Sequence, residues 1–339
     1  MIMEQIKPIK ILSAKQISIQ NPLCEDWMDN PVKYNEDYVR AVDPDFKQFI
    51  SAGDARRLGK LLKRALATSL SALQEGGIED PDAIITGTGF GSIENTELFL
   101  DALVREGEQL LKPTQFMQST HNTASSLIGI HTRCHGYNST YSQKGLSFDS
   151  ALYDAWMQFN IGRIRSALVG GHDEMSPVFS GFVRKAGHVK EGEICSEAAV
   201  SVLLAESGDN AYCTLEGVCL LDTPSADSLA KVINGMTAGG VDAVMTGKSG
   251  NEENDSWYGF LDSLLPDVAQ LRYKPLFGVN FSSSATGFYA AACCLREGRI
   301  PSVLTVTGKP AECRKGILVV NVVEGRHYSF SLLKPVCGR

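Results

Sequence analysis

Residues 136–174 read GYNSTYSQKGLSFDSALYDAWMQFNIGRIRSALVGGHDE, and this stretch decides the fold. A short β-rich run, 138–142, passes through Lys144 and Gly145 into a segment whose apolar residues recur at helical spacing. A second short apolar run, 165–170, then ends at a pair of glycines. The order strand, helix, strand is typical of a layered protein in which helices cover a sheet.

The same alternation of elements continues upstream of this stretch. Leucines at i, i+3, i+4 and i+7 spacing predict a helix over residues 54–73 with one buried stripe. The opposite face carries basic residues, namely Arg57, Lys60, Lys63 and Arg64. We expect that face to be exposed to solvent.

Downstream, elements of the same kinds recur from Asn210 onward. Residues 212–220, 242–246 and 316–323 are predicted strands, and 226–237 and 285–296 are predicted helices. The sequence therefore predicts an α/β protein made of two halves that meet near Glu206.

The composition excludes several classes of function. The chain has 339 residues, 43% of them hydrophobic and 21% charged, which is ordinary for a globular protein. A net charge of −7 argues against a dedicated nucleic-acid partner. No apolar stretch approaches the roughly 20 residues that cross a bilayer, so we expect no membrane partner and a cytoplasmic location. Nine cysteines without CxxC pairs suit reduced thiols.

Metal and cofactor motifs are absent from the sequence. His121, His172 and His188 are too dispersed for a metal site with ligand-like spacing. Residues 87–91 read GTGFG after a predicted strand, but a dinucleotide fingerprint requires GxGxxG. We therefore predict neither a metal nor a cofactor.

Several segments, in one order, carry a resemblance to a known family. They are residues 55–58 (ARRL), 85–94 (ITGTGFGSIE), 122–125 (NTAS), 169–174 (VGGHDE), 196–199 (SEAA), 241–255 and 281–301. From about residue 50 to its end, the chain resembles the β-ketoacyl-ACP synthase family of the thiolase superfamily. The resemblance implies a thiolase-like layered fold (αβαβα) with two related α/β halves, 1–206 and 207–339, the second of them shortened.

In that family the nucleophile is a cysteine on a tight strand-to-helix turn, where the helix N-terminus lowers the thiol pKa. The nucleophile position can be located by counting from Gly136 upstream or from the paired glycines downstream. Both counts give Gly145. Glycine offers no side-chain nucleophile. A shift of one or two residues would give Lys144 or Gln143 instead, and neither can carry a thioester.

The other family positions are also changed in this sequence. Two catalytic histidines of the family stabilise the enolate, and the resemblance places Thr246 and Phe281 there. Leu276 stands where the family has a lysine, with Lys274 close by, and residues 323–328 replace a glycine-rich gating loop. The resemblance thus implies that the catalytic Cys/His/His set is missing.

This pattern resembles a chain-length factor, a synthase-like subunit that pairs with an active ketosynthase. We expect such a non-condensing role in type II polyketide, aryl-polyene or fatty-acid-like biosynthesis. The family joins its subunits through the strand before the nucleophile turn, as a heterodimer with a ketosynthase or as a homodimer. Here that strand consists of Asn138, Ser139, Thr140, Tyr141 and Ser142.

The resemblance also suggests contacts with the acyl chain and its carrier. Phe116, His121 and Tyr141 are candidates to line an acyl cavity, although such residues are equally well explained as core. Arg56 and Arg57 align with basic positions that dock the acidic acyl carrier protein, the alternative being a solvated helix face.

Two rival hypotheses remain open at the level of sequence. One is a thiolase-fold acyltransferase with a rebuilt active site, which would use Ser142, Ser147 or Cys195 with His121 or His172. The other is a homodimeric binder of acyl chains or carrier protein that never meets a synthase. Only the acyltransferase should form an acyl adduct on this chain.

Overall fold

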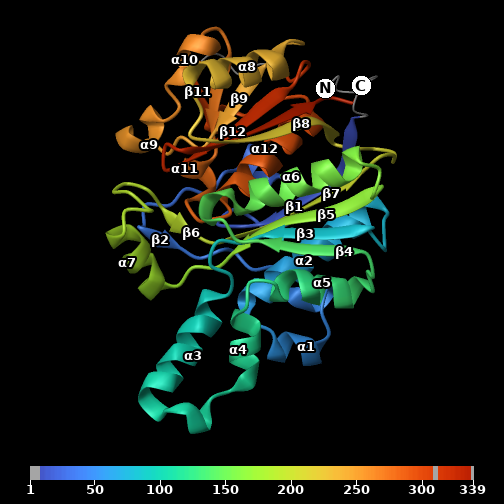
Figure 1. Ribbon diagram of the computed structural model, residues 1–339. Helices are drawn as coiled ribbons and strands as arrows, with labels where there is room; N and C mark the ends of the chain where they lie inside the picture. The colour runs from blue at the N-terminus through green and yellow to red at the C-terminus, as the bar shows by residue number, and fades with distance from the viewer. Residues whose placement is uncertain (1–7, 308–311, 337–339) are drawn as a thin grey trace.

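The computed structural model describes residues 8–307 and 312–336 and shows alternating layers of helix and sheet (Figure 1). The strands are β1 (Ile9–Ile17), β2 (Tyr38–Val39), β3 (Ala83–Gly87), β4 (Tyr137–Tyr141), β5 (Ser166–Asp173), β6 (Cys195–Ser196), β7 (Ala198–Ala205), β8 (Cys213–Asp222), β9 (Ala243–Thr246), β10 (Ala269–Arg272), β11 (Thr305–Thr307), β12 (Ile317–Val323) and β13 (His327–Lys334). The α-helices are α1 (Ala52–Arg57), α2 (Lys60–Gly76), α3 (Ile93–Glu106), α4 (Pro113–Ser119), α5 (Thr123–Thr132), α6 (Ser147–Asn160), α7 (Pro177–Lys185), α8 (Ala226–Thr237), α9 (Glu252–Ser256), α10 (Phe260–Leu264), α11 (Lys274–Phe277) and α12 (Ser283–Glu297).

The strand order is the same in the two halves of the chain. In the first half the order is β4-β3-β5-β7-β1, and in the second it is β10-β9-β12-β13-β8, with β11 added at the edge. Parallel and antiparallel pairings also match: β3 is parallel to β4 and β5, as β9 is to β10 and β12, and the remaining pairs are antiparallel. A short pairing of β1 with β8 joins the halves into one sheet of eleven strands. The division into domains 1–206 and 207–339 stays a prediction.

Two helices lie between the halves and form the middle layer (Figure 1). Helix α6 contacts β3 and β5 of the first half and β8 of the second, and α12 contacts β1, β7, β12 and β13. Every side chain of α12 from Ser283 to Leu295 is buried, because small and apolar residues occupy all of its faces. Helices α2 and α5 cover the outer side of the first half, and α8 and α10 cover that of the second. The expected αβαβα layering is confirmed.

The helix expected over 54–73 is instead two helices, α1 and α2. Leu58 between them adopts an extended conformation, with ψ of 137°. The Gly59 amide donates to Gln118 Oε1 over 2.8 Å, and a Cβ on Gly59 would lie 2.5 Å from Asn95 Nδ2. Gly59 thus lies where α3 and α4 approach the break between the helices, and a side chain there would have to displace the Asn95 amide.

Arg64, expected on the exposed face, is in fact buried, and only 1% of it is accessible to solvent. Its guanidinium donates to Glu197 Oε2 over 2.9 Å and to Asp43 Oδ1 over 2.5 Å. A buried carboxylate such as Glu197 needs a charged partner, and Arg64 supplies it. Helical spacing alone could not reveal this partner, which lies 133 residues away.

Two features lie outside the sequence expectations. The sequence pattern predicts no element over residues 9–17, yet strand β1 (Ile9–Ile17) lies at the centre of the sheet between β7 and β8. Helices α3 and α4 project from the body as a hairpin (Figure 1). Of the helices in the described part of the chain, none is long and apolar enough to cross a membrane.

Candidate functional site

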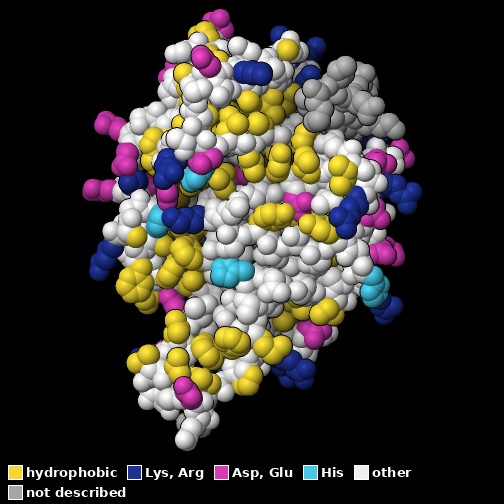
Figure 2. All heavy atoms as spheres, viewed as in Figure 1, with side chains coloured by type: hydrophobic (Ala, Val, Ile, Leu, Met, Phe, Trp, Pro, Cys, Tyr) yellow, Lys and Arg dark blue, Asp and Glu magenta, His cyan; other side chains and the backbone are white. Residues whose placement is uncertain are grey.

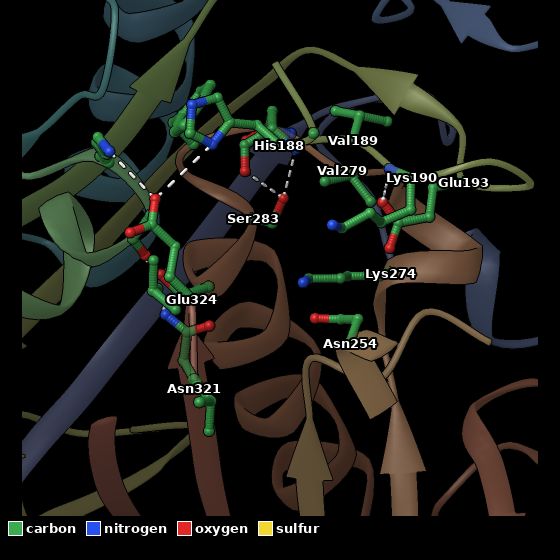
Figure 3. A pocket seen from close by; sticks show the side chains of 18 of the residues that line it. His188, Val189, Lys190, Glu193, Asn254, Lys274, Val279, Ser283, Asn321 and Glu324 are labelled. Carbon is green, nitrogen blue, oxygen red and sulfur yellow. Dashed lines mark hydrogen bonds and ion pairs between the residues drawn. The ribbon is translucent and has the colours of Figure 1, made fainter. Parts of the chain in front are cut away.

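A cavity of about 100 Å³ lies at the N-termini of α6 and α12 (Figure 3). Its walls come from both halves of the chain. They are Lys144, Gly145, Met175, residues 187–190, Glu193, Asn254, Trp257, Lys274, residues 279–281, Ser283, Ser284 and residues 321–324. A concave site with a few convergent polar groups is where chemistry would be expected.

The turn that enters α6 forms one wall of this cavity. Strand β4 ends at Tyr141, and Lys144 then adopts a left-handed conformation with φ of 48° before Gly145. A Cβ on Gly145 would lie 3.0 Å from Val323 Cγ2, so a side chain at this position would point toward the end of β12. Around the cavity, as far as the structure describes its lining, no residue is a cysteine.

An aromatic side chain occupies the opposite wall, just before α12. Phe281 is 7% exposed, and its ring packs edge-on against Phe90 with ring centroids 4.3 Å apart. It also meets the His188 ring at 5.5 Å, and a Cβ on Gly89 would clash with it. The ring therefore fills this corner and offers no strong hydrogen-bond donor to the cavity.

Thr246 and Leu276 are not part of the cavity wall. Thr246 Oγ1 donates to the Leu271 carbonyl over 2.7 Å, and Leu276 is buried in the core. Gly247, the next residue after β9, does not line the cavity either, since a Cβ there would clash with the hydroxyl of the buried Tyr258. The structure thus brings Gly145 and Phe281 together with Lys274 rather than with Leu276.

Lys274 extends into the cavity from the start of α11 (Figure 3). Lys274 is partly exposed, and partial desolvation by the surrounding protein lowers the pKa of its amine below the ordinary lysine value. The charges of Glu193 and Asp255 act in the opposite direction.

Ion pairs form the rim of the cavity. Glu324 Oε1 lies 3.1 Å from Lys144 Nζ and 3.8 Å from His188 Nδ1, so three separate segments meet there. The hydrogen bond from Lys144 lowers the pKa of Glu324. Lys190 pairs with Glu253 at 2.9 Å. Sequence reasoning missed Glu324 and His188 as site residues, because no motif links the segments that carry them.

A match to a family model decides the family. Residues 25–231 match the model for the N-terminal domain of β-ketoacyl synthases. This chain belongs to the β-ketoacyl synthase family. No curated protein matches the sequence.

Solved structures of ketosynthases share the fold. One is AntDE:AntF, a type II PKS acyl-carrier protein in complex with its ketosynthase bound to the hexaketide, at 13% identity. Others are the ishigamide ketosynthase/chain length factor at 14% and a β-ketoacyl synthase from Burkholderia phymatum STM815 at 15%. Each has a TM-score of 0.79, and the alignments cover 97% of this chain and 99%, 99% and 100% of the others. At these identities the likeness shows the fold alone, and it confirms the thiolase-like fold class.

Beside the cavity of this β-ketoacyl synthase homologue lies a buried polar framework, formed by Asp173, Glu174 and Glu197. Asp173 accepts hydrogen bonds from Thr88 Oγ1 and from the amides of Gly89 and Phe90, and Ser282 Oγ also donates to it. These bonds tie the glycine turn after β3 to the start of α12.

Glu174 and Glu197 complete this framework. Glu174 accepts from the Glu94 amide over 3.0 Å, and burial raises the pKa of Glu174 to about 7. Glu197 accepts from Arg64 and from the amides of Ala41 and Met175.

The three candidates for an acyl cavity do not reach the main cavity. Phe116 is 57% exposed on α4, His121 is exposed at the start of α5, and Tyr141 is half-buried at the end of β4. None of the three is among the described lining residues. Arg56 and Arg57 are exposed at the end of α1. Their acyl-binding and carrier-docking roles stay predictions.

Among the residues suggested for a rebuilt active site, Ser147, Cys195 and His172 form no nucleophile–base pair with one another. Ser147 Oγ donates to the Lys144 carbonyl and accepts from the Gln143 amide. Burial raises the pKa of Cys195 to about 12 and lowers the pKa of His172 to about 4. His121 and His172 line a separate cavity of only about 10 Å³.

Strand β4 forms an edge of the sheet, and apolar side chains are exposed near it. Ile130 on α5 is 74% exposed, and Ile161 at the end of α6 is 64% exposed. More apolar residues are exposed on the α3–α4 hairpin, namely Leu98, Leu100, Val104, Phe116 and Met117. Figure 2 shows hydrophobic side chains gathered on the projecting hairpin. Exposed apolar side chains beside an open strand edge are typical of surfaces that bind other proteins.

Proposed function

We propose that this chain is a non-condensing subunit of the chain-length-factor type, which pairs with an active ketosynthase in type II polyketide, aryl-polyene or fatty-acid-like biosynthesis. The observation that carries the proposal is Gly145, which lies on the turn into α6 and faces the cavity. Acyl transfer in this family requires a thiolate at that turn, and a glycine has none.

The rest of the cavity supports the same conclusion. Decarboxylative condensation needs donors aimed at the developing enolate. The Phe281 ring stands at one family histidine position and can only pack. The other family position falls at Thr246, whose hydroxyl is engaged by the Leu271 carbonyl.

The partner would bind at the free edge of β4. Tyr137–Tyr141 pair with β3 on one side, and within the described part of the chain no strand pairs with the other side, where a strand from a second subunit could bind. Exposed Ile130 and Ile161 would be covered by the same contact. The ishigamide neighbour is itself a ketosynthase/chain length factor, which fits a heterodimer, and a homodimer is the alternative.

An acyl carrier protein is the second proposed partner, in the cytoplasm. The AntDE:AntF neighbour contains an acyl-carrier protein bound to its ketosynthase. Arg56 and Arg57 on this chain would attract the acidic surface of such a carrier and speed the encounter.

Intact-protein mass spectrometry tests the missing chemistry. The purified chain is incubated with an acyl-CoA and with an acyl-carrier thioester, alone and with a candidate ketosynthase. We expect acylation of the ketosynthase only. A stable acyl adduct on this chain would overturn the proposal in favour of an acyltransferase.

Co-purification tests the partnership. We expect Ile161→Glu to reduce recovery of the ketosynthase at least about tenfold, because it buries a charge in the contact. Val178→Glu is the matched control, since Val178 on α7 is 62% exposed and lies away from β4. Equal recovery with both variants would argue against a partner at β4, and a stable complex with itself alone would favour the homodimeric binder.

A further inference from the structure

Lys274 is a cavity lysine that has no direct ion-pair partner among the described residues. Within the described residues, its Nζ makes no hydrogen bond and lies within 4.0 Å of no carboxylate. By contrast, Lys144 and Lys190, which line the same cavity, pair with Glu324 at 3.1 Å and with Glu253 at 2.9 Å. An unpaired charge that the protein partly desolvates is costly, whereas a neutral amine at the same place costs less.

We propose that Lys274 is a covalent site for a small carbonyl compound, and that its amine forms an imine with an aldehyde or ketone inside the cavity. The amine attacks the carbonyl carbon, the carbonyl oxygen leaves as water, and a C=N bond takes its place. The reaction is a condensation without change of oxidation state, so it needs neither oxidant nor reductant. The site requires no partner subunit.

The state of the amine favours a carbonyl over an anionic ligand. Desolvation lowers the pKa of Lys274, and each unit of lowering gives about tenfold more neutral amine at neutral pH. Only the neutral amine is a nucleophile, and a desolvated lysine is a recognised way to obtain one. A carboxylate ligand would instead require the charged form.

Lys274 has space for a ligand beside it, and a polar side chain nearby that can take part in the reaction. Lys274 borders both the main cavity and a neighbouring one of about 400 Å³ that includes Tyr34, Glu36 and Gly192, so a ligand can reach it from either. Asn254 Nδ2 donates to the Gly247 carbonyl and to Ser249 Oγ, which fixes its amide. Its oxygen then points into the cavity beside the Lys274 amine (Figure 3) and can accept a hydrogen bond from the carbinolamine.

Reductive trapping tests the inference on the unmodified chain. The protein is incubated near pH 7 with propanal and cyanoborohydride, and the rate of propylation of each lysine is followed by peptide mass spectrometry. We expect Lys274 to be modified at least about tenfold faster than Lys144 and Lys190, which serve as controls within the same cavity. Equal or slower modification of Lys274 would overturn the proposal.

A variant gives a second readout. Lys274→Arg keeps a positive charge but removes the primary amine, so the fast phase should vanish while Lys144 and Lys190 react as before. Persistence of the fast phase in this variant would place the reaction elsewhere and overturn the assignment. Neither result bears on acylation or on co-purification with a ketosynthase, so this inference and the proposed function fail separately.

Discussion

The polar framework and the cavity meet at the N-terminus of α12. Their polar side chains differ in how fully they are paired. In the framework, the carboxylates of Asp173 and Glu197 each accept several hydrogen bonds, and Glu197 is neutralised by Arg64. In the cavity, Gly145 has no side chain, and the amine of Lys274 has no hydrogen-bond or ion-pair partner among the described residues. The framework bonds involve no side chain at position 145. The contacts that stabilise this part of the fold are therefore distinct from the residues that line the cavity.

The largest expected effect comes from breaking the framework with Glu197→Ala. The variant leaves Arg64 buried with only the partly exposed Asp43 as partner. Breaking a buried pair by removal of one partner costs about 3–5 kcal/mol of the free energy of unfolding. Urea denaturation measures this loss.

Glu193→Ala is the control on the cavity side. Glu193 is 5% exposed but has no ion pair within the described part of the chain, and it accepts one hydrogen bond from the Lys190 amide. We expect a loss of only about 1–2 kcal/mol. Equal losses for the two variants would contradict the contrast between the regions.

Arg64 and Glu197 also show why the sequence predicts the fold better than the site. Strands such as β5 and β7 are apolar runs, and apolar runs are a local signal. Strand β1 mixes lysine, serine and glutamine with isoleucine, and only its pairing with β7 and β8 explains its central place. Arg64 appears exposed on a helical wheel because its partners lie far away in sequence.

Flanking elements fix the place of Gly145 on the turn between β4 and α6, and its match to the family's nucleophile position stays a prediction. The turn after β9 is different: Thr246 donates a hydrogen bond to the Leu271 carbonyl of β10 and does not line the cavity. Likewise Lys274, rather than Leu276, reaches the cavity, because α11 is a single short turn whose residues face different sides.

The next largest expected effect is the pH dependence of the free energy of unfolding, which tests the framework side of the comparison. Burial raises the pKa of Glu174 from an ordinary 4.5 to about 7. Its contribution to stability is therefore fully present below pH 4.5 and lost as the pH rises through 7. Relative to Glu174→Gln, the wild type should lose about 2–3 kcal/mol between pH 5 and pH 8.

At each pH, the free energy of unfolding of the wild type must be compared with that of Glu174→Gln. Burial lowers the pKa of the neighbouring His172 to about 4, so this histidine adds stability as pH rises and opposes Glu174 in the wild type. Both proteins retain His172, and its contribution cancels. Parallel stability curves for wild type and Glu174→Gln would show that Glu174 does not titrate in this range.

The smallest expected effect on stability comes from restoring a side chain in the cavity with Gly145→Cys. The new Cβ would lie 3.0 Å from Val323 Cγ2, and Val323 is partly exposed at the end of β12, so it can move by a few tenths of an ångström. We expect a change of no more than about 1 kcal/mol in the free energy of unfolding.

The chemical readout of Gly145→Cys is more informative than its stability. The thiol at a helix N-terminus should accept an acyl group from a thioester, which mass spectrometry detects as an adduct. Condensation with a malonyl thioester should still fail, since Phe281 offers no donor to the enolate. An adduct without product would mean that the turn is intact and the donors are missing. Product formation would mean instead that another group of the cavity, with Lys274 the first to test, supplies the missing hydrogen bond.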